Sequence, residues 1–231
     1  WNGGSVWIET GLGLENKKTR WTFGGAFERP AHAFRLSVFD RTETEDRDII
    51  STSENTFFAL LFKGDYRDYF RAKNGFEVAG RYRLKPRLNL SGTLTAYTYE
   101  SMAVVATQSL FRSGSPFRIN PAVTPGKIGR FYLGLIYDTR RHAPRFYNAW
   151  HILAFYERGF REFPLDGLHL TAVRHQKTIW GNQAFILRGH LATRTHTAEQ
   201  FLFDIGGVGT LRGFGIKEFT GNRMIMFNLD Y

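Results

Sequence analysis

The chain contains no cysteine, and this absence removes several kinds of chemistry at once. Without a thiol there is no disulfide scaffold, thiolate zinc site, cysteine nucleophile or iron–sulfur cluster. Long hydrophobic runs are also lacking, since the longest one, Phe57 to Phe62, is far shorter than the roughly 20 residues of a membrane-spanning helix. The chain begins at Trp1 without a basic and apolar leader, which predicts a mature or clipped chain.

The composition that remains is that of a folded protein with an unusual balance. Hydrophobic residues make up 42% and charged residues 23%, which excludes wholesale disorder, and 231 residues suffice for one domain or two small ones. Aromatics reach 16% and glycine 24 residues, yet the mean hydropathy is −0.32. Outer-membrane β-barrels have this combination, because their strands alternate lipid-facing apolar residues with polar residues facing the lumen.

Alternation with a period of two is the main pattern along the chain. It is cleanest over 88–98, and 76–84 repeats it on the other side of Lys85-Pro86, which predicts a β-hairpin. Further alternating segments are 20–27, 34–38, 130–138 and 224–231, and less regular strand candidates are 5–13, 56–66, 148–158, 167–178 and 183–194. The pattern thus predicts about eleven strands and no amphipathic helix.

Long and short connections alternate between these strands, as they do in outer-membrane barrels. The predicted long connections are 99–127, 159–166 and 195–222, and the short ones are 85–86, 141–147 and 179–182. The charged stretch 40–55 is an exception that falls on the short side and is not assigned to a strand. Because the same alternation continues on both sides of the proline-rich and glycine-rich 99–127 segment, we expect a single domain over 1–231. A soluble β-sandwich or lipocalin-like barrel would also alternate, so the pattern alone leaves that class open.

A glycine-rich segment near the end of the chain is the most specific motif. Gly206-Gly207 precedes the tetrad Leu211-Arg212-Gly213-Phe214, and a final strand follows. This arrangement resembles the sixth-loop signature of the outer-membrane β-barrel assembly superfamily, the bacterial surface antigen family that includes BamA, TamA and the two-partner secretion transporters. In that family the loop folds back into the lumen of the barrel.

Two other stretches resemble elements of the same family. Tyr137-Asp138-Thr139-Arg140, at the end of a predicted strand, is similar to the family's recurrent Tyr-Asp-Thr-Arg element. The stretch 65–70 followed by Gly75 is similar to a segment of one bacterial branch. The resemblance covers most of the chain and is strongest from 128 onward.

The resemblance implies an all-β fold, an antiparallel transmembrane β-barrel of 16 strands with the loop between the eleventh and twelfth. About ten predicted strands precede the loop here and one follows, so we expect an incomplete portion of about eleven strands, truncated at one or both ends. The alternative is that the last strand is a terminal insertion signal and the barrel is small and complete.

An arginine on a loop inside a barrel needs an acidic partner, because an unpaired buried guanidinium is costly. Asp230 lies on the polar face of the next strand. The resemblance implies a contact between Arg212 and Asp230 that holds the loop inside the barrel. The alternative is a solvated surface loop whose arginine moves freely.

The function that the resemblance implies is insertion of β-barrel proteins into the outer membrane of a Gram-negative-type bacterium, or translocation of polypeptide across it. The implied partners are outer-membrane lipid and lipopolysaccharide, unfolded β-barrel or secreted polypeptides, and periplasmic assembly factors. The alternatives are a membrane anchor or pore for a fused passenger domain, a general porin, and a soluble β-domain that binds a ligand.

Other chemistries find little support in the sequence. Gly207, Gly209 and Gly213 lack the spacing and the following helix of a dinucleotide loop. The seven histidines have no metal-ligand spacing, although His175 and His190 lie on adjacent predicted strands. No nucleophile elbow, catalytic carboxylate pair or phosphate loop is present, so we expect no enzyme, no cofactor and no metal. The net charge of +10 is spread along the chain, and we expect no nucleic-acid partner.

Overall fold

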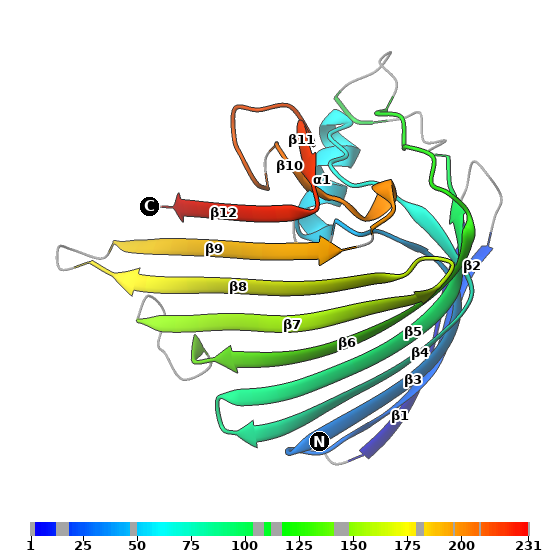
Figure 1. Cartoon of the computed structure of the whole chain (residues 1–231), viewed down its shortest axis with the longest axis horizontal. Coiled ribbons are helices and arrows are strands. Elements are labelled where there is room, and N and C mark those ends of the chain that lie inside the picture. Colours follow the sequence, from blue (N-terminus) through cyan, green and yellow to red (C-terminus); the bar gives the residue numbers. More distant parts are fainter. Residues whose placement is uncertain are drawn as a thin grey trace.

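The computed structural model describes residues 3–12, 19–46, 50–103, 109–111, 117–140, 148–178, 183–195, 197–207 and 209–230. Its main element is one ten-stranded antiparallel sheet in which each strand pairs with the next along the chain, until β12 takes the place beside β9. The strands are β1 (Gly3–Leu12), β2 (Thr19–Glu28), β3 (His32–Glu43), β4 (Phe70–Lys85), β5 (Leu88–Ser101), β6 (Gly126–Asp138), β7 (Ala149–Arg161), β8 (Leu165–Lys177), β9 (Ala184–Thr195) and β12 (Arg223–Asp230). The sheet is strongly curved, and its edge strands β1 and β12 do not meet (Figure 1).

The predicted antiparallel all-β architecture is therefore confirmed, while closure into a barrel is not part of the structure. The Lys85-Pro86 hairpin is present, with Lys85 opposite Leu88. The charged stretch after position 40 is partly a strand, because β3 continues to Glu43 beyond a bulge between Phe39 and Arg41. The predicted long connection 159–166 is wrong, because β7 ends at Arg161 and β8 already begins at Leu165.

One predicted strand, 56–66, is a helix. Helix α1 spans Thr52–Phe62, and Ser51 caps it: the Ser51 hydroxyl accepts the Glu54 backbone N–H, while the Glu54 carboxylate accepts the Ser51 backbone N–H. This capping box satisfies two backbone donors that the first helical turn leaves open. Lys63 ends the helix in the left-handed conformation. The apolar residues 57–62 are distributed around the helix instead of along one face, so the sequence lacks the periodicity of an amphipathic helix there.

The helix also explains the exception among the connections. Because the described residues between β3 and β4 form a helix and no strand, the segment 44–69 joins the same end of the sheet as 102–125 and 196–222. We call this the long-connection end, and the opposite end, which carries 29–31 and 86–87, the short-connection end. Some predicted features lie outside the described residues, namely the turns 141–147 and 179–182, the last residue Tyr231, and the histidines His142 and His196.

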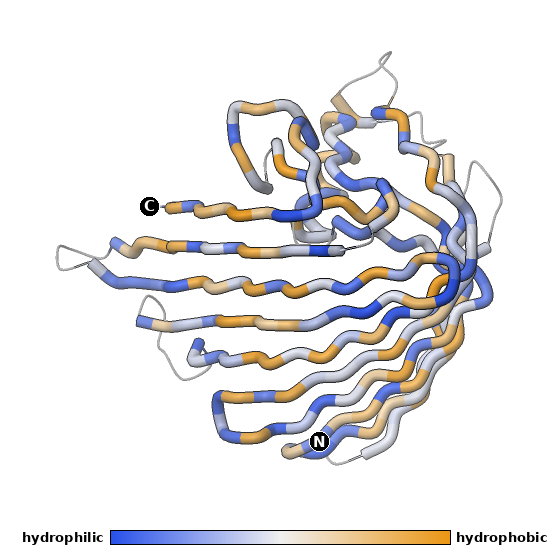
Figure 2. The backbone as a smooth tube through the Cα atoms, viewed as in Figure 1, coloured by the Kyte–Doolittle hydropathy of each residue, from blue (hydrophilic) through white to orange (hydrophobic). Residues whose placement is uncertain are grey.

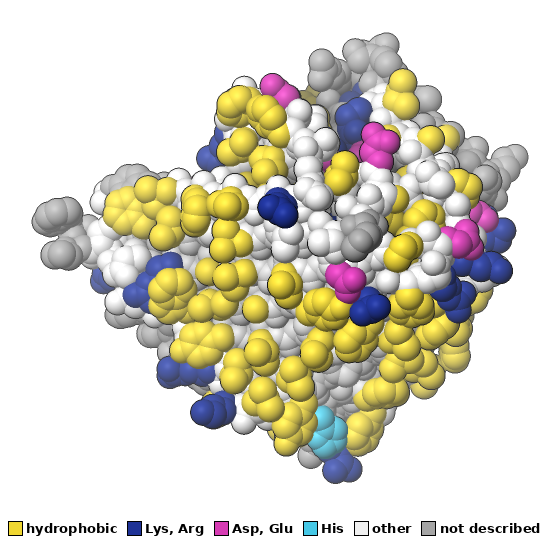
Figure 3. Space-filling view, in the orientation of Figure 1, with side chains coloured by type: hydrophobic (Ala, Val, Ile, Leu, Met, Phe, Trp, Pro, Cys, Tyr) yellow, Lys and Arg dark blue, Asp and Glu magenta, His cyan; other side chains and the backbone are white. Residues whose placement is uncertain are grey.

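The two faces of the sheet have opposite polarity. Large apolar side chains along the alternating strands point outward and are exposed, among them Phe23, Phe34, Leu36, Leu133, Leu135, Leu170, Leu187, Ile225 and Phe227. The alternate positions point into the curve, and several of their polar and charged side chains are buried: Thr22, Ser37, Thr95, Arg130, Glu157, His169 and Arg194. Figure 2 shows the resulting alternation along the strands, and Figure 3 shows hydrophobic side chains gathered over the outer face with Lys and Arg toward its margins.

The concave face holds a compact aromatic cluster toward the long-connection end. The Phe70 and Tyr99 rings stack at 4.0 Å between centroids, and Phe201 meets Tyr99 edge-on at 5.6 Å. Phe201 lies far along the chain, in the short 3-10 helix Glu199–Phe201, so the cluster ties the segment after β9 to the middle of the sheet. Among the described residues, no helix has both the length and the apolar character needed to cross a membrane.

Candidate functional site in the concave face

The segment between β9 and β12 folds into a hairpin that packs against the concave face of the sheet (Figure 1). Its strands are β10 (Phe203–Ile205) and β11 (Phe219–Gly221), which pair antiparallel. Phe203 approaches two inward-facing side chains, with its ring 5.3 Å from that of His169 and 4.7 Å from the Arg194 guanidinium. The predicted motif residues therefore sit at the tip of a hairpin that is anchored at its base.

The backbone conformation of the hairpin tip explains why the motif contains glycines. Gly206 has φ +136, and a Cβ there would lie 2.2 Å from the Gly215 carbonyl oxygen. Gly207 and Gly213 also have positive φ, at 92° and 91°. Side-chain residues rarely adopt these angles, so the tip requires glycine at these places. The turn closes through the Gly206 backbone N–H, which donates to the Thr210 hydroxyl at 2.7 Å.

Arg212 and Asp230 are in contact, as the resemblance implied. The Arg212 guanidinium donates to the Asp230 carboxylate at 3.3 Å. The setting differs from the expected one, because the Arg212 side chain is 78% exposed and that of Asp230 39%. An exposed pair of this kind contributes little to stability. The neighbouring contact, from the Asn228 side-chain amide to the Thr210 carbonyl at 2.9 Å, also joins the tip to β12.

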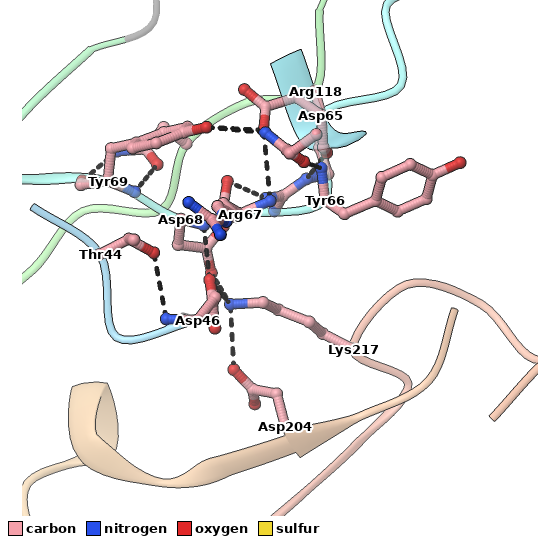
Figure 4. Close-up of polar contacts among 12 residues, drawn as sticks. Thr44, Asp46, Asp65, Tyr66, Arg67, Asp68, Tyr69, Arg118, Asp204 and Lys217 are labelled. Carbon is pink, nitrogen blue, oxygen red and sulfur yellow. Dashed lines mark hydrogen bonds and ion pairs between the residues drawn. The ribbon is translucent and has the colours of Figure 1, made fainter. Parts of the chain in front are cut away.

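The strongest polar contact of the hairpin is made by Lys217. Its ammonium lies 2.7 Å from Asp46, 2.6 Å from Asp68 and 3.2 Å from Asp204, and its side chain is 12% exposed. Asp46 and Asp68 belong to the segment between β3 and β4, and Asp204 to β10 (Figure 4). We call these four residues the Lys217 cluster. It joins two segments that are about 150 to 170 positions apart in sequence.

Further groups hold the carboxylates of the cluster in place. The Asp68 backbone N–H donates to Asp46 at 2.7 Å, and the Arg118 guanidinium binds Asp68. Burial raises the pKa of Asp46 and of Asp204 even though Lys217 lowers both. For Lys217, burial lowers the pKa, but the facing carboxylates outweigh it and the pKa is raised. The ammonium is therefore firmly charged, whereas the raised pKa values of Asp46 and Asp204 favour protonation of these two carboxyl groups.

A second buried network lies on β7, β8 and β9. Glu157 is fully buried and accepts from His169 at 2.7 Å and from Arg194, through both nitrogens Nε and Nη2. Arg194 also donates to the Phe201 carbonyl at 2.7 Å, which fixes the chain just before the hairpin. Beside it, Arg130 donates to Glu45 at 2.8 Å and lies 4.5 Å from the Phe201 ring.

The other predicted elements lie apart from the hairpin. Tyr137 and Asp138 end β6 at the short-connection end, where Asp138 accepts from Arg140 at 2.8 Å and 3.0 Å in a local ion pair. The stretch 65–70 is hydrogen-bonded to α1. The buried side chain of Asn55, a residue of this helix, donates to Asp65 and to the Tyr69 hydroxyl, both at 2.9 Å. This stretch also supplies Asp68 to the Lys217 cluster.

His175 and His190, the pair on adjacent strands, do not come together. His175 lies opposite Ile186 and His190 opposite Thr171, so the two are separated along the sheet. In the described ranges no group of three or more histidine, aspartate or glutamate side chains is arranged so that it could hold a metal ion. The sequence interpretation missed Lys217, Asp46, Asp68, Asp204, Glu157 and Arg194 as anchoring residues, because their partners are distant in sequence. For Glu157 on β7 and Arg194 on β9, the available signal was their polar character at inward positions of alternating strands, whereas the four residues of the Lys217 cluster lie outside the ten-stranded sheet and carry no such signal.

Comparison with known proteins gives no further identification. No family model matches the chain, and no curated protein is significantly similar to it in sequence.

Proposed function

We propose that this chain forms the wall and inner loop of an outer-membrane β-barrel of the BamA/TamA-like surface antigen family. Its role would be insertion of outer-membrane proteins or translocation of polypeptide across the outer membrane. The proposal rests on the Gly-Gly and Leu-Arg-Gly-Phe motif on a hairpin that folds back against the concave face. It also rests on the polarity of the sheet, whose outer face is apolar and whose concave face is polar. This polarity is the main support for a location in the membrane.

The inverted polarity favours lipid over water as the surroundings of the outer face. A soluble sandwich buries its apolar set between two sheets. Here Leu133 and Leu135 are each 44% exposed on the outer face, while Glu157 and Arg130 on the concave face are 0% and 3% exposed. A sheet with an apolar exterior and a polar interior matches the pattern of a membrane barrel. The proposal requires that the edges of β1 and β12 be paired in the membrane, because free backbone groups are costly in lipid.

The activity would involve no covalent step. The concave face would supply the lumen, and the hairpin would occupy part of it, held by the Lys217 cluster at one side and by Arg194 at the base. Strand pairing at a barrel seam would then guide the substrate polypeptide. A general porin is the weaker candidate, because a hairpin anchored by buried ion pairs would obstruct free diffusion. An anchor or pore for a passenger domain shares the same barrel and stays an alternative.

Leu133→Arg tests the membrane part of the proposal. A guanidinium in the outer face of a membrane strand costs about 2–4 kcal/mol near the bilayer midplane. We expect urea titration in lipid vesicles to show this loss for Leu133→Arg and much less for Thr93→Arg, whose side chain lines the concave face. Equal stability of the two variants would contradict a lipid-facing outer surface.

Arg212→Ala and Asp230→Ala test the functional motif. Because the pair is exposed, we expect each change to cost less than about 1 kcal/mol of stability. We nevertheless expect both to impair assembly or secretion, measured as the amount of folded barrel proteins or exported polypeptide in cells. Reversing the pair with Arg212→Asp and Asp230→Arg is the control for charge pairing. Full activity of both alanine variants would show that the contact has no functional role.

A further inference from the structure

The short-connection end carries a group of cations that the proposed function does not use. Arg29 in the β2–β3 turn, and Arg83, Lys85 and Arg87 around the β4–β5 turn, are all exposed. We call these four residues the basic rim. The two turns are joined by a hydrogen bond of 2.7 Å from the Arg83 backbone N–H to the Ala31 carbonyl.

The basic rim is not neutralised by the part of the chain that the structure describes. Over residues 28–32 and 83–88, Glu28 is the single acidic side chain. None of the four cations forms an ion pair with another described residue. At the long-connection end the cations are of two kinds: Arg71 and Lys217 face carboxylates, whereas the exposed Lys127 and Arg161 form no ion pair with another described residue. The basic rim is distinct because all four of its cations lack an ion-pair partner among the described residues while they lie close together on two joined turns.

The basic rim borders the apolar outer face directly. The Arg29 guanidinium lies 5.1 Å from the Phe27 ring centroid, and Phe27 is exposed on the outer face. Tyr82 and Leu84, next to Arg83, are exposed as well. On β7 and β8 the same arrangement recurs, with the Arg174 guanidinium 5.1 Å from the ring of the exposed Trp150. Aromatic rings with arginines beyond them are typical of the level where a membrane meets water.

We propose that the basic rim binds the phosphate groups of anionic phospholipids in the leaflet that meets the short turns. This inference rests on the proposed membrane location. The short turns of outer-membrane barrels face the periplasm, so the lipid in contact with the rim would be phospholipid. A cation near an anionic lipid surface strengthens binding roughly fivefold at low salt, and the effect is screened as salt rises. The rim would thereby set the depth and the orientation of the sheet.

Binding to vesicles tests this. The full chain is refolded from denaturant onto vesicles of phosphatidylcholine alone, or of phosphatidylcholine with phosphatidylglycerol, and the bound fraction is measured by flotation at low and high salt. The rim variant carries Arg29→Gln, Lys85→Gln and Arg87→Gln. The control carries Lys127→Gln, Arg158→Gln and Arg161→Gln at the long-connection end, so both lose three positive charges.

We expect phosphatidylglycerol to strengthen binding of the wild type at least tenfold at low salt, the rim variant to lose most of that gain, and the control to keep it. Equal binding of the wild type to both vesicles, or equal losses in the two variants, would overturn the rim proposal while leaving the membrane location intact. Failure of the wild type to bind either vesicle would instead overturn the membrane location, and the rim proposal with it.

Discussion

Replacing Glu157 with alanine is expected to destabilise the folded sheet by about 3–5 kcal/mol. Glu157 is fully buried and is the shared acceptor for His169 and Arg194. Removing one partner of a buried ion pair leaves the other charge without compensation, and that cost is large. Urea titration of the protein in lipid vesicles, followed by tryptophan fluorescence, measures the loss.

Glu157→Gln is the matched control for this prediction. Glutamine keeps the size of the side chain and one oxygen that accepts from Arg194, so we expect a clearly smaller loss than for alanine. The alanine variant should also loosen the hairpin, because Arg194 holds the Phe201 carbonyl and contacts the Phe203 ring. An alanine variant within about 1 kcal/mol of the wild type would show that the network does not stabilise the sheet.

Lys217→Met is expected to detach the tip of the hairpin from the segment between β3 and β4. The change leaves Asp46, Asp68 and Asp204 without their shared cation, although Arg118 still binds Asp68. Breaking such a cluster costs about 3–5 kcal/mol when it is fully buried, and we expect that loss to appear as opening of the hairpin. Because the chain has no cysteine, two cysteines can be introduced and spin-labelled, Ile216→Cys at the tip of the hairpin and Gln176→Cys on β8. The distance between the two labels reports how far the tip lies from the sheet.

Arg212→Met is the control for this measurement, since it removes a cation from the same hairpin but from an exposed pair. We expect a broadened and longer distance distribution for Lys217→Met and an unchanged one for Arg212→Met. The reverse result would identify Arg212 as the main anchor of the hairpin and contradict the role given to the Lys217 cluster.

Acidification should act differently on the wild type and on Lys217→Met. Burial, opposed by Lys217, leaves the pKa values of Asp46 and Asp204 raised. A carboxyl with a raised folded-state pKa favours the folded state as pH falls, and that contribution is lost as pH rises through the folded pKa. Mild acid therefore should not open the wild-type hairpin. In the methionine variant, where the carboxylates repel one another, lowering the pH should close it again.

The alternating strands could be read from the sequence because each strand carries its own period-two pattern. Segments such as 88–98 and 130–138 predict strands without reference to the rest of the fold. Helix α1 was missed because its apolar residues surround the helix, although Ser51 and Glu54 carry the spacing of a capping box. Counting 56–66 as a strand instead of a helix assigns the charged stretch 40–55 to the short-connection end, whereas it belongs to the long-connection end.

The anchoring of the hairpin could be predicted only in part. The contact of Arg212 with Asp230 was implied by the resemblance to a known family, and the two residues are separated by less than twenty positions, in a motif and in the strand that follows it. The Lys217 cluster could not be found in this way, because Asp46 and Asp68 come from a connection that no local pattern places near β10. The Lys217 contacts are buried, whereas the contact of Arg212 with Asp230 is exposed. This difference in burial depends on the arrangement of the whole sheet and is not visible in the local sequence.

The account depends most on the claim that the outer face of the sheet contacts lipid. A scan of β6 tests it directly: single cysteines at positions 129 to 137 are spin-labelled in the cysteine-free chain, and their accessibility to oxygen and to a water-soluble nickel complex is measured in vesicles. We expect oxygen accessibility to peak at Phe131, Leu133 and Leu135 and to fall at Arg130, Tyr132 and Gly134. High accessibility of Leu133 and Leu135 to the nickel complex, or loss of the period of two, would contradict the account.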